Sequence, residues 1–514
     1  MSAVPTIKGV GFYSDCNKQT ARYDAVKRSF TEHFGAPPSF FSRAPGRVNL
    51  IGEHIDYCHF SVLPMAIEVD VIAAIGAVSR NSITIVNTDR KFAPVEIALP
   101  HANEDIVVNK EMPSWADYFK CGLIVARKYM QETGLGDVNA KNGALQGFNA
   151  LFDGSVPTGG GLSSSAAFCI AATLAVLKVN GVKDISKADL TEITVVCEHY
   201  VGLSNGGMDQ SASINGEDDK VLLISFKPKL EAMAFPFPAT SPETVFLISN
   251  SLVTANKTET APANYNLRVV EVAIAADILA HKFGLKVEQD SNIHTASLRG
   301  VFDAYFTQKL GMCGWDGKDI DMGISRLEQM LHVVQDTYTE EHKDGLTIDQ
   351  VRVLTGTADS ESFKKTYLCH FPVRFDKLNV YRRSIHVYSD SLRVLKTVRA
   401  VRQFGGDSEA FLRDVGALMD DSQVSTRDYN HASAALCDEL CSLGRENGSY
   451  GSRVTGAGFG GCVVHLTTVE KVAGLVNALK EEYYGRHFPG MSTDALNDAI
   501  VVSKPAMGAC IVEM

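Results

Sequence analysis

Residues 43–57, with the sequence RAPGRVNLIGEHIDY, place two arginines, two acidic residues, a histidine and two glycines around a short apolar run. A strand that served packing alone would alternate apolar and polar residues and would not end in Gly-Glu-His-Ile-Asp. Glycine at the end of a strand lets the backbone approach a ligand closely, and clustered Glu, His and Asp side chains can hydrogen-bond several neighbouring hydroxyls. The segment therefore indicates a binding site for a free sugar.

A second segment, residues 156–165, is a glycine-serine loop that leads into an apolar helix from Ala166. Glycines expose backbone N–H groups, serine hydroxyls add donors or a metal ligand, and the helix dipole favours negative charge at this point. The Gly-x-x-x-x-Gly-Lys pattern of a Walker loop is absent. The loop predicts a phosphate site, and the alternative from composition alone is a flexible loop with an N-cap serine.

A third glycine loop, residues 456–461, formally matches the Gly-x-Gly-x-x-Gly pattern of dinucleotide-binding proteins. That pattern must follow a strand and open a helix. Here the strand-like residues 462–466 come directly afterwards. The sequence therefore predicts a glycine hairpin that packs near another loop, and a Rossmann site is excluded.

The composition is that of an ordinary globular protein, and 514 residues are enough for two or three domains. The net charge of −11 argues against nucleic acid or an anionic membrane as the main partner. The N-terminus has no apolar signal segment, and the apolar helix-like run 166–177 is too short to span a bilayer. The 11 cysteines are scattered without paired ligand spacing, so we expect a reduced, cytoplasmic protein without a zinc site.

Hydrophobic patterning predicts alternating strands and helices. Three prolines at 236–242 mark a domain boundary, and the polar residues 288–361 resemble an insertion or helical elaboration. The predicted strands are 69–75, 83–86, 221–224, 245–248 and 462–466, and the predicted helices are 115–133, 187–203, 265–283 and one from Val469.

Taken together, residues 45–56, 157–167 and 454–461 resemble the three motifs of the GHMP small-molecule kinases. The form Gly-Glu-His-Ile-Asp-Tyr at 52–57 is similar to galactokinases, and the resemblance to the fungal members runs nearly end to end. It implies an α+β fold with two lobes and the active site in the cleft between them. The N-terminal lobe, 1–240, would be ribosomal S5 domain 2-like and carry motifs one and two; the C-terminal lobe, 241–514, would be ferredoxin-like with insertions and carry motif three.

The resemblance also implies an activity, the ATP-dependent phosphorylation of α-D-galactose at its C1 hydroxyl, which yields galactose 1-phosphate and ADP and begins the Leloir pathway. Asp209 would be the general base, and Arg47 would keep that carboxylate ionised and offset charge on the transferring phosphoryl group. Both would line the sugar site, together with Glu53, His54, Asp56, Gly206 and Tyr265. The ATP phosphates would lie on Gly159, Gly160, Gly161, Leu162, Ser163, Ser164 and Ser165, and Mg²⁺ would be held by Ser165 and Glu198.

Each of these residues also has a purely structural interpretation. Arg47 alone could be an ordinary ion-pair partner, Asp209 an N-cap, Glu198 part of a solvated helix face and His54 a hydrogen-bonded core histidine. Trp115 is interpreted as a core residue. The three motifs in order favour the functional interpretation for the first four.

Two alternative functions remain open at this point. Some relatives of fungal galactokinases bind galactose and ATP without useful turnover and act as co-inducers that bind the repressor of the galactose genes. Those proteins lack a Ser-Ala pair in motif two, whereas residues 162–167 here are uninterrupted, which favours a working kinase without excluding a second role. The other alternative is an N-acetylgalactosamine kinase. We expect a monomer.

Overall fold

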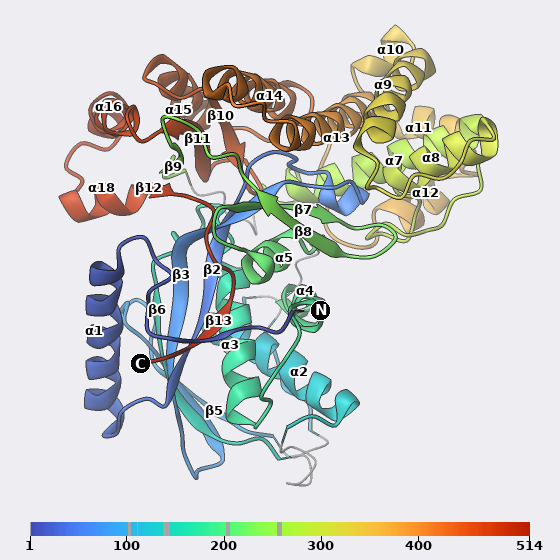
Figure 1. Ribbon diagram of the computed structural model, residues 1–514. Helices are drawn as coiled ribbons and strands as arrows, with labels where there is room; N and C mark the ends of the chain where they lie inside the picture. The colour runs from blue at the N-terminus through green and yellow to red at the C-terminus, as the bar shows by residue number, and fades with distance from the viewer. Residues whose placement is uncertain (1, 101–103, 110–111, 137–143, 202–205, 254–259) are drawn as a thin grey trace.

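The computed structural model describes residues 2–100, 104–109, 112–136, 144–201, 206–253 and 260–514. It has a lower part built on one large sheet and an upper part built on a smaller sheet and many helices (Figure 1). The large sheet is mixed, with seven strands in the spatial order β1 (Thr6–Lys8), β13 (Cys510–Glu513), β2 (Phe40–Asn49), β3 (Pro64–Ala77), β6 (Phe148–Gly154), β4 (Ser82–Asn87) and β5 (Val95–Ala98).

Helices cover both faces of this sheet. Helix α1 (Cys16–Phe34) lies on one face, and α3 (Ser164–Val179) packs on β2 and β3 from the other face, with α2 (Trp115–Thr133) outside it (Figure 1). The residues of α3 are mostly small and apolar, so the helix can be buried between the sheet and α2. The same side carries α4 (Lys187–Val195), η2 (Glu198–Val201) and α5 (Met208–Asn215).

The upper part contains a four-stranded antiparallel sheet. Its strands, in spatial order, are β10 (Gly451–Thr455), β11 (Cys462–Thr468), β9 (Thr244–Asn250) and β12 (Ile500–Ser503). A two-stranded sheet, β7 (Lys220–Ser225) and β8 (Glu231–Pro236), lies at the junction with the lower part (Figure 1).

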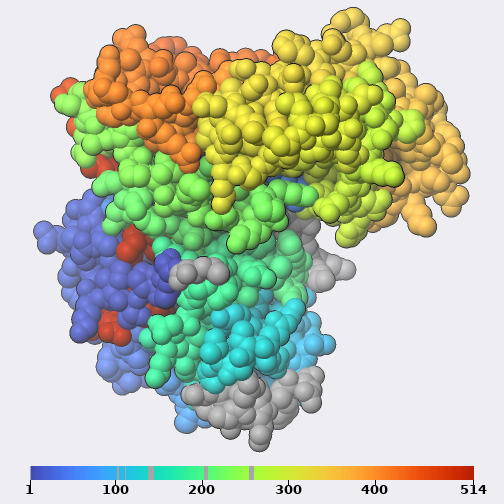
Figure 2. Space-filling model, turned by 45° about the vertical axis from the view of Figure 1, so that its right-hand side comes forward, coloured from blue at the N-terminus to red at the C-terminus, as the bar shows by residue number. Residues whose placement is uncertain are grey.

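Helices make up most of the remaining upper part, and residues 288–361 are the helical elaboration that their polarity predicts. The yellow segment of Figure 2 shows this elaboration overhanging one side of the molecule. The described helices of the whole upper part, inside and outside this elaboration, are α7 (Tyr265–Phe283), α8 (Leu298–Ala304), η3 (Tyr305–Lys309), α9 (Ile320–Thr337), α10 (Glu340–Lys343), α11 (Ile348–Thr355), α12 (Ser360–Tyr367), α13 (Val380–Arg402), α14 (Ser408–Asp428), α15 (Ala435–Glu446), α16 (Val472–Ala478), η4 (Leu479–Tyr484), α17 (Gly485–His487) and α18 (Thr493–Ala499).

Two predicted helices differ from those observed. The helix predicted over 187–203 ends at Val195, since the β-branched run Thr194-Val195-Val196 gives way to a tight turn in which the Cys197 N–H bonds the Thr194 carbonyl. The predicted end, 202–203, lies outside the described residues. The helix predicted from Val469 begins at Val472, after a turn.

A continuous hydrophobic core joins the two parts, because one cluster of buried side chains includes residues from Val4 to Ile511. The second sheet begins with β9, close to the predicted boundary at 240/241, whereas β13 returns to the first sheet. The division into residues 1–240 and 241–514 stays a prediction. Within the described parts of the chain, no helix has both the length and the apolar character needed to cross a membrane.

Candidate active site

The first two sequence motifs meet through their backbones. A bulge in β2 between Pro45 and Arg47 interrupts its pairing with β3. The Arg47 N–H donates to the Leu162 carbonyl at 3.2 Å, and its Nη1 donates to the Gly161 carbonyl at 2.5 Å. A Cβ at Gly46 would lie 2.9 Å from the Leu162 oxygen. The end of β2 is therefore fixed against the glycine-serine loop by contacts that leave no room for a side chain at Gly46.

The third motif is the hairpin between β10 and β11, which confirms the predicted glycine hairpin that leads into a strand. Its backbone lies directly against the glycine-serine loop. A Cβ at Gly456 would lie 2.3 Å from the Gly161 carbonyl oxygen, and one at Gly461 would lie 3.0 Å from the Gly160 oxygen. All three motifs, from distant parts of the sequence, thus converge on residues 160–162.

Gly456→Ala should separate these two loops. Gly456 has φ +85°, which disfavours a Cβ, and the added methyl would meet backbone that has no freedom to rotate away. We expect a loss of about 2–4 kcal/mol in the free energy of unfolding, together with a higher KM for ATP. Urea unfolding and steady-state kinetics measure both. Gly474→Ala in α16 is the control, because no atom lies within 4 Å of its Cβ position; an equal loss there would contradict the prediction.

Asp209 lies in the first turn of α5, where its carboxylate meets Arg47. Its Oδ1 accepts hydrogen bonds from Arg47 Nε at 2.9 Å and Nη2 at 2.7 Å. The Asp209 side chain is 24% exposed, whereas that of Arg47 is only 4% exposed. Helix α5 is anchored to the β2 bulge by the Ser213 hydroxyl, which donates to the Pro45 carbonyl at 2.6 Å. Arg47 therefore links an accessible carboxylate to the glycine-serine loop.

Glu53 is buried, and both of its carboxylate oxygens have protein partners. Oε1 accepts from the Gly456 N–H at 2.6 Å and lies 3.5 Å from Arg453 Nη1, while Oε2 accepts from Asn49 Nδ2. Burial raises the pKa of Glu53, and Arg453 and Arg47 oppose that rise. Glu53 thus ties the first motif to the third. Its predicted contact with the sugar stays a prediction.

His54 also bridges motifs one and three. Its Nε2 is 2.9 Å from the Ala457 carbonyl, which can only accept, so Nε2 carries the proton and Nδ1 accepts from the Tyr57 hydroxyl at 2.9 Å. Burial lowers the pKa of His54 to about 3, which keeps the ring neutral at physiological pH. Both ring nitrogens are engaged within the protein. The ring centroid of Tyr265, the first residue of α7, lies 5.4 Å away.

Asp56 and Gly206 are in direct contact. A Cβ at Gly206 would lie 2.5 Å from Asp56 Oδ2, so only glycine allows this approach. Burial, and secondarily the charge of Asp209, raises the pKa of Asp56 to about 6. Asp209 in α5 therefore contributes to the raised pKa of Asp56, which lies in η1 (Asp56–Cys58). Such a pair of carboxylates is stabilised when hydroxyl donors lie between its members.

Asp56→Asn should make the ligand-free protein more stable at alkaline pH. A carboxyl with a pKa near 6 in the folded state and an ordinary value of 3.8 when unfolded opposes folding increasingly as pH rises from about 4 to 6, and fully above that range. At about 1.4 kcal/mol per pKa unit, we expect a gain of about 2–3 kcal/mol at pH 8 and a smaller gain at pH 5. Chemical denaturation at both pH values measures it, and equal gains would refute the assignment.

The glycine-serine loop has the features of an anion site at the start of α3. Gly159 and Gly161 have φ +74° and +75°, and Ser163, which precedes the helix, has φ +61°. The Ser163 hydroxyl is buried and has no hydrogen-bond partner among the described residues. A buried donor at a helix N-terminus can be satisfied by a phosphate oxygen.

Ser165 and Glu198 are brought together from α3 and η2. The Ser165 hydroxyl donates to Glu198 Oε1 at 2.5 Å. Glu198 is only 4% exposed, so it is not part of a solvated face. A hydroxyl and a carboxylate this close supply the oxygen ligands that Mg²⁺ prefers, and the pair fits such an ion.

Several buried polar residues that support the site are not evident from the sequence alone. The Thr455 hydroxyl accepts from the Asn49 N–H at 2.8 Å, and His386 of α13 lies 2.9 Å from the Glu53 carbonyl. Asn49 and Thr455 lie inside motifs one and three, so their place in the sequence could have indicated that they belong near the site. His386 has no such signal, because only the folded chain brings α13 to Glu53.

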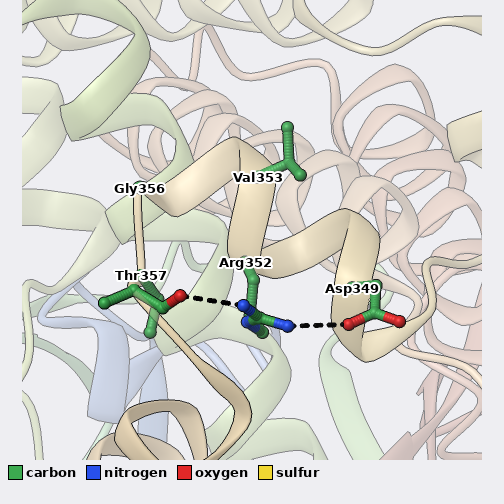
Figure 3. Close-up of a pocket in the computed structure, with 6 residues that line it drawn as sticks. Asp349, Arg352, Val353, Gly356 and Thr357 are labelled. Atoms are coloured by element: carbon green, nitrogen blue, oxygen red, sulfur yellow. Dashed lines mark hydrogen bonds and ion pairs between the residues drawn. The ribbon is translucent and has the colours of Figure 1, made fainter.

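One surface cavity lies apart from these residues. It has a volume of about 370 Å³, and its lining, in α11 and the following loop, consists of Asp349, Arg352, Val353, Gly356, Thr357 and Ala358 (Figure 3). The Arg352 guanidinium there is already bonded to Asp349 at 2.9 Å and to the Ala358 carbonyl at 2.8 Å. None of the predicted site residues lines this cavity.

Comparison with family models gives three matches along the chain. Residues 28–77 match the galactokinase galactose-binding signature, residues 117–217 the N-terminal domain of GHMP kinases and residues 408–485 the C-terminal domain of GHMP kinases. The three contain the sugar-type segment, the glycine-serine loop and the hairpin described above.

The chain is also similar to several relatives over nearly its full length. It is 47% identical to a galactokinase of Schizosaccharomyces pombe, with 100% of this chain and 99% of the relative covered. It is 50% identical to one of Candida albicans, with 99% of each covered, and 43% identical to one of Saccharomyces cerevisiae, with 95% and 94% covered.

Solved structures confirm the expected fold. A crystal structure of Lactococcus lactis galactokinase complexed with galactose matches with a TM-score of 0.62 at 19% identity, covering 95% of this chain and 99% of that one. A mevalonate kinase matches with a TM-score of 0.50 at 15% identity, covering 91% and 100%.

Proposed function

The chain belongs to the galactokinases, a family of the GHMP kinases, and from that membership we propose how its residues phosphorylate the C1 hydroxyl of α-D-galactose with ATP. The products are galactose 1-phosphate and ADP. One observation carries the assignment of the site: Arg47 bonds the Asp209 carboxylate and the Gly161 carbonyl at the same time. A sugar hydroxyl at Asp209 would thereby be held beside the loop that suits phosphates.

Asp209 accepts the proton of the C1 hydroxyl in this proposal. It is the more exposed member of its ion pair, and Oδ2 is not engaged by Arg47, so a carboxylate oxygen is available to the sugar. A positioned base of this kind contributes roughly 10²–10⁴-fold to the rate.

Arg47 has two tasks. Its two hydrogen bonds hold the Asp209 carboxylate in place, and its position beside Gly161 places a fixed positive group near the transferring phosphoryl group. Because phosphoryl transfer depends chiefly on positioning and electrostatic stabilisation, a buried guanidinium held by three hydrogen bonds is well suited to this role.

The nucleotide site consists of residues 159–165 and the start of α3. The Ser163 hydroxyl, which has no partner in the described parts of the chain, and the N–H groups of the loop would bind phosphate oxygens. Ser165 and Glu198 would hold Mg²⁺, which neutralises charge on the phosphates when bound. These two residues orient one another through their hydrogen bond of 2.5 Å.

The sugar site combines Asp56, Gly206 and Tyr265 with the segment that includes Glu53 and His54. Glu53 and His54 act partly through structure, since their protein contacts hold the motif-three hairpin against the sugar segment. A site built from buried hydrogen-bonding groups rejects an epimer because a misplaced hydroxyl leaves polar groups unpaired.

A coupled assay of ADP release with galactose, glucose and N-acetylgalactosamine tests this function. We expect turnover with galactose and a much lower kcat/KM with glucose. Preferred turnover of N-acetylgalactosamine would favour the alternative sugar kinase. Absence of turnover with every sugar, while galactose still binds, would favour the co-inducer.

Three finer proposals accompany the activity. All eleven cysteines are free, which fits a reducing compartment such as the cytoplasm. We expect a monomer, measurable by light scattering.

A second role in binding a repressor of galactose genes would require ligand-dependent association, and a pull-down that retains no partner with or without galactose plus ATP would count against it.

A further inference from the structure

Gln210 lies next to the proposed base and contacts the proposed metal ligand. It is the third residue of α5, directly after Asp209, and its side chain is completely buried. Its Nε2 donates to Glu198 Oε2 at 3.0 Å, while the other oxygen of Glu198 accepts from Ser165. Glu198 is therefore held from both sides by neutral donors.

The orientation of the Gln210 amide is determined by this contact. An ionised carboxylate only accepts hydrogen bonds, so the amide nitrogen must face Glu198 and the amide oxygen must point elsewhere. That oxygen, Oε1, is buried and has no hydrogen-bond partner among the residues that the structure describes. A buried acceptor without a donor is unfavourable, so the geometry calls for a donor from a bound group at this position.

We propose that Gln210 is a positioning residue for the metal: its N–H fixes Glu198, and its Oε1 accepts a hydrogen bond from a water molecule bound to Mg²⁺. Magnesium in phosphate-binding sites usually keeps several waters, which are donors and would satisfy this acceptor. The inference rests on the proposed metal site of Ser165 and Glu198.

The position of Gln210 also joins two parts of the site. Asp209 and Gln210 share the first turn of α5, which is anchored at Ser213 to the β2 bulge. The first turn of α5, which carries the proposed base Asp209, would therefore also resist a displacement of Glu198. Residues around metal ligands that act in this way typically change metal affinity by roughly 10–100-fold when replaced.

Gln210→Met tests the proposal, since methionine has a similar volume but neither a donor nor an amide oxygen. The thermal midpoint of the full chain is followed at fixed ADP while MgCl2 is titrated. We expect the MgCl2 concentration at half-maximal stabilisation to rise about 10-fold or more. The stabilisation by galactose alone should not change. If Gln210→Met does not fold, Gln210→Asn, which shortens the reach of the amide, is measured in the same way.

Asn215→Leu is the matched control on the same helix. Its amide donates to Thr191 Oγ1 at 3.2 Å and to the Ser211 carbonyl at 2.9 Å, so its loss disturbs α5 without touching Glu198. A comparable rise with Asn215→Leu would overturn the proposal, as would a MgCl2 midpoint within twofold of the wild type for Gln210→Met. Glu198→Gln distinguishes a failure of this inference from a failure of the proposed metal site. If Glu198→Gln raises the MgCl2 midpoint and Gln210→Met does not, only the inference about Gln210 fails. If neither variant changes the MgCl2 midpoint, the proposed metal site fails as well.

Discussion

Asp209→Ala is expected to lower kcat for galactose by about 10²–10⁴-fold while galactose still binds. The substitution removes the only carboxylate that Arg47 contacts beside the glycine-serine loop in the described structure. It leaves the other proposed sugar contacts, Asp56 and Tyr265, in place. The chemical step should therefore suffer far more than ground-state binding.

Single-turnover kinetics and calorimetric titration with galactose measure these two quantities separately. Asp189→Ala is a matched control, because Asp189 is likewise an acidic residue in the first turn of a short helix, α4, of the same lobe. It should retain near wild-type turnover. Residual turnover above a tenth of the wild-type rate in Asp209→Ala would refute the assignment of the base.

Arg47→Met should have the second largest effect, a fall of about 10²–10³-fold in kcat/KM. Methionine occupies similar space but removes the charge and all three hydrogen bonds, including the one to Gly161. Arg47→Lys should restore little of the lost kcat/KM. A lysine ammonium is a single point of charge and cannot donate hydrogen bonds to Asp209 and to the Gly161 carbonyl at the same time, as the planar guanidinium does.

The double variant Arg47→Met/Asp209→Ala provides the critical comparison. Residues that act as a unit are not additive, so the double variant should be little worse than Asp209→Ala alone. Arg299→Met is the control, since Arg299 is a buried arginine paired with Asp303 at 2.9 Å in α8 and stacked on Trp315. Arg299→Met should lower the free energy of unfolding and leave kcat unchanged. Full additivity in the double variant would show that Arg47 and Asp209 act independently.

Much of the local structure follows from sequence patterns. The helices 115–133 and 265–283 are observed with the predicted limits, because each has continuous helical spacing and a glycine just beyond its end that adopts a left-handed conformation. The rejection of a dinucleotide site also follows from the strand after the glycine loop. These features depend on neighbours in sequence, which a single chain displays.

Contacts between distant segments could not be predicted in this way. Glu53 and His54 stand out as polar residues, yet their bonds to Gly456 and Ala457 depend on how a hairpin some 400 positions later is placed. The unpaired oxygen of Gln210 is likewise a property of packing between α5 and η2. Sequence patterns therefore indicate candidate site residues, but they do not indicate the partners that those residues have in the folded chain.

The place of β13 between β1 and β2 has a consequence for synthesis on the ribosome. Strand β1 is made first, yet its pairing in the sheet is with β13, and the buried Arg43 bonds the carbonyls of Met507 and Gly508. The sheet that carries the first motif is thus completed only after residues 507–513 emerge. Until then the newly made lobe has an open strand edge, so a pause in synthesis before residues 507–513 leaves a chain exposed to aggregation even though every proposed catalytic residue is present.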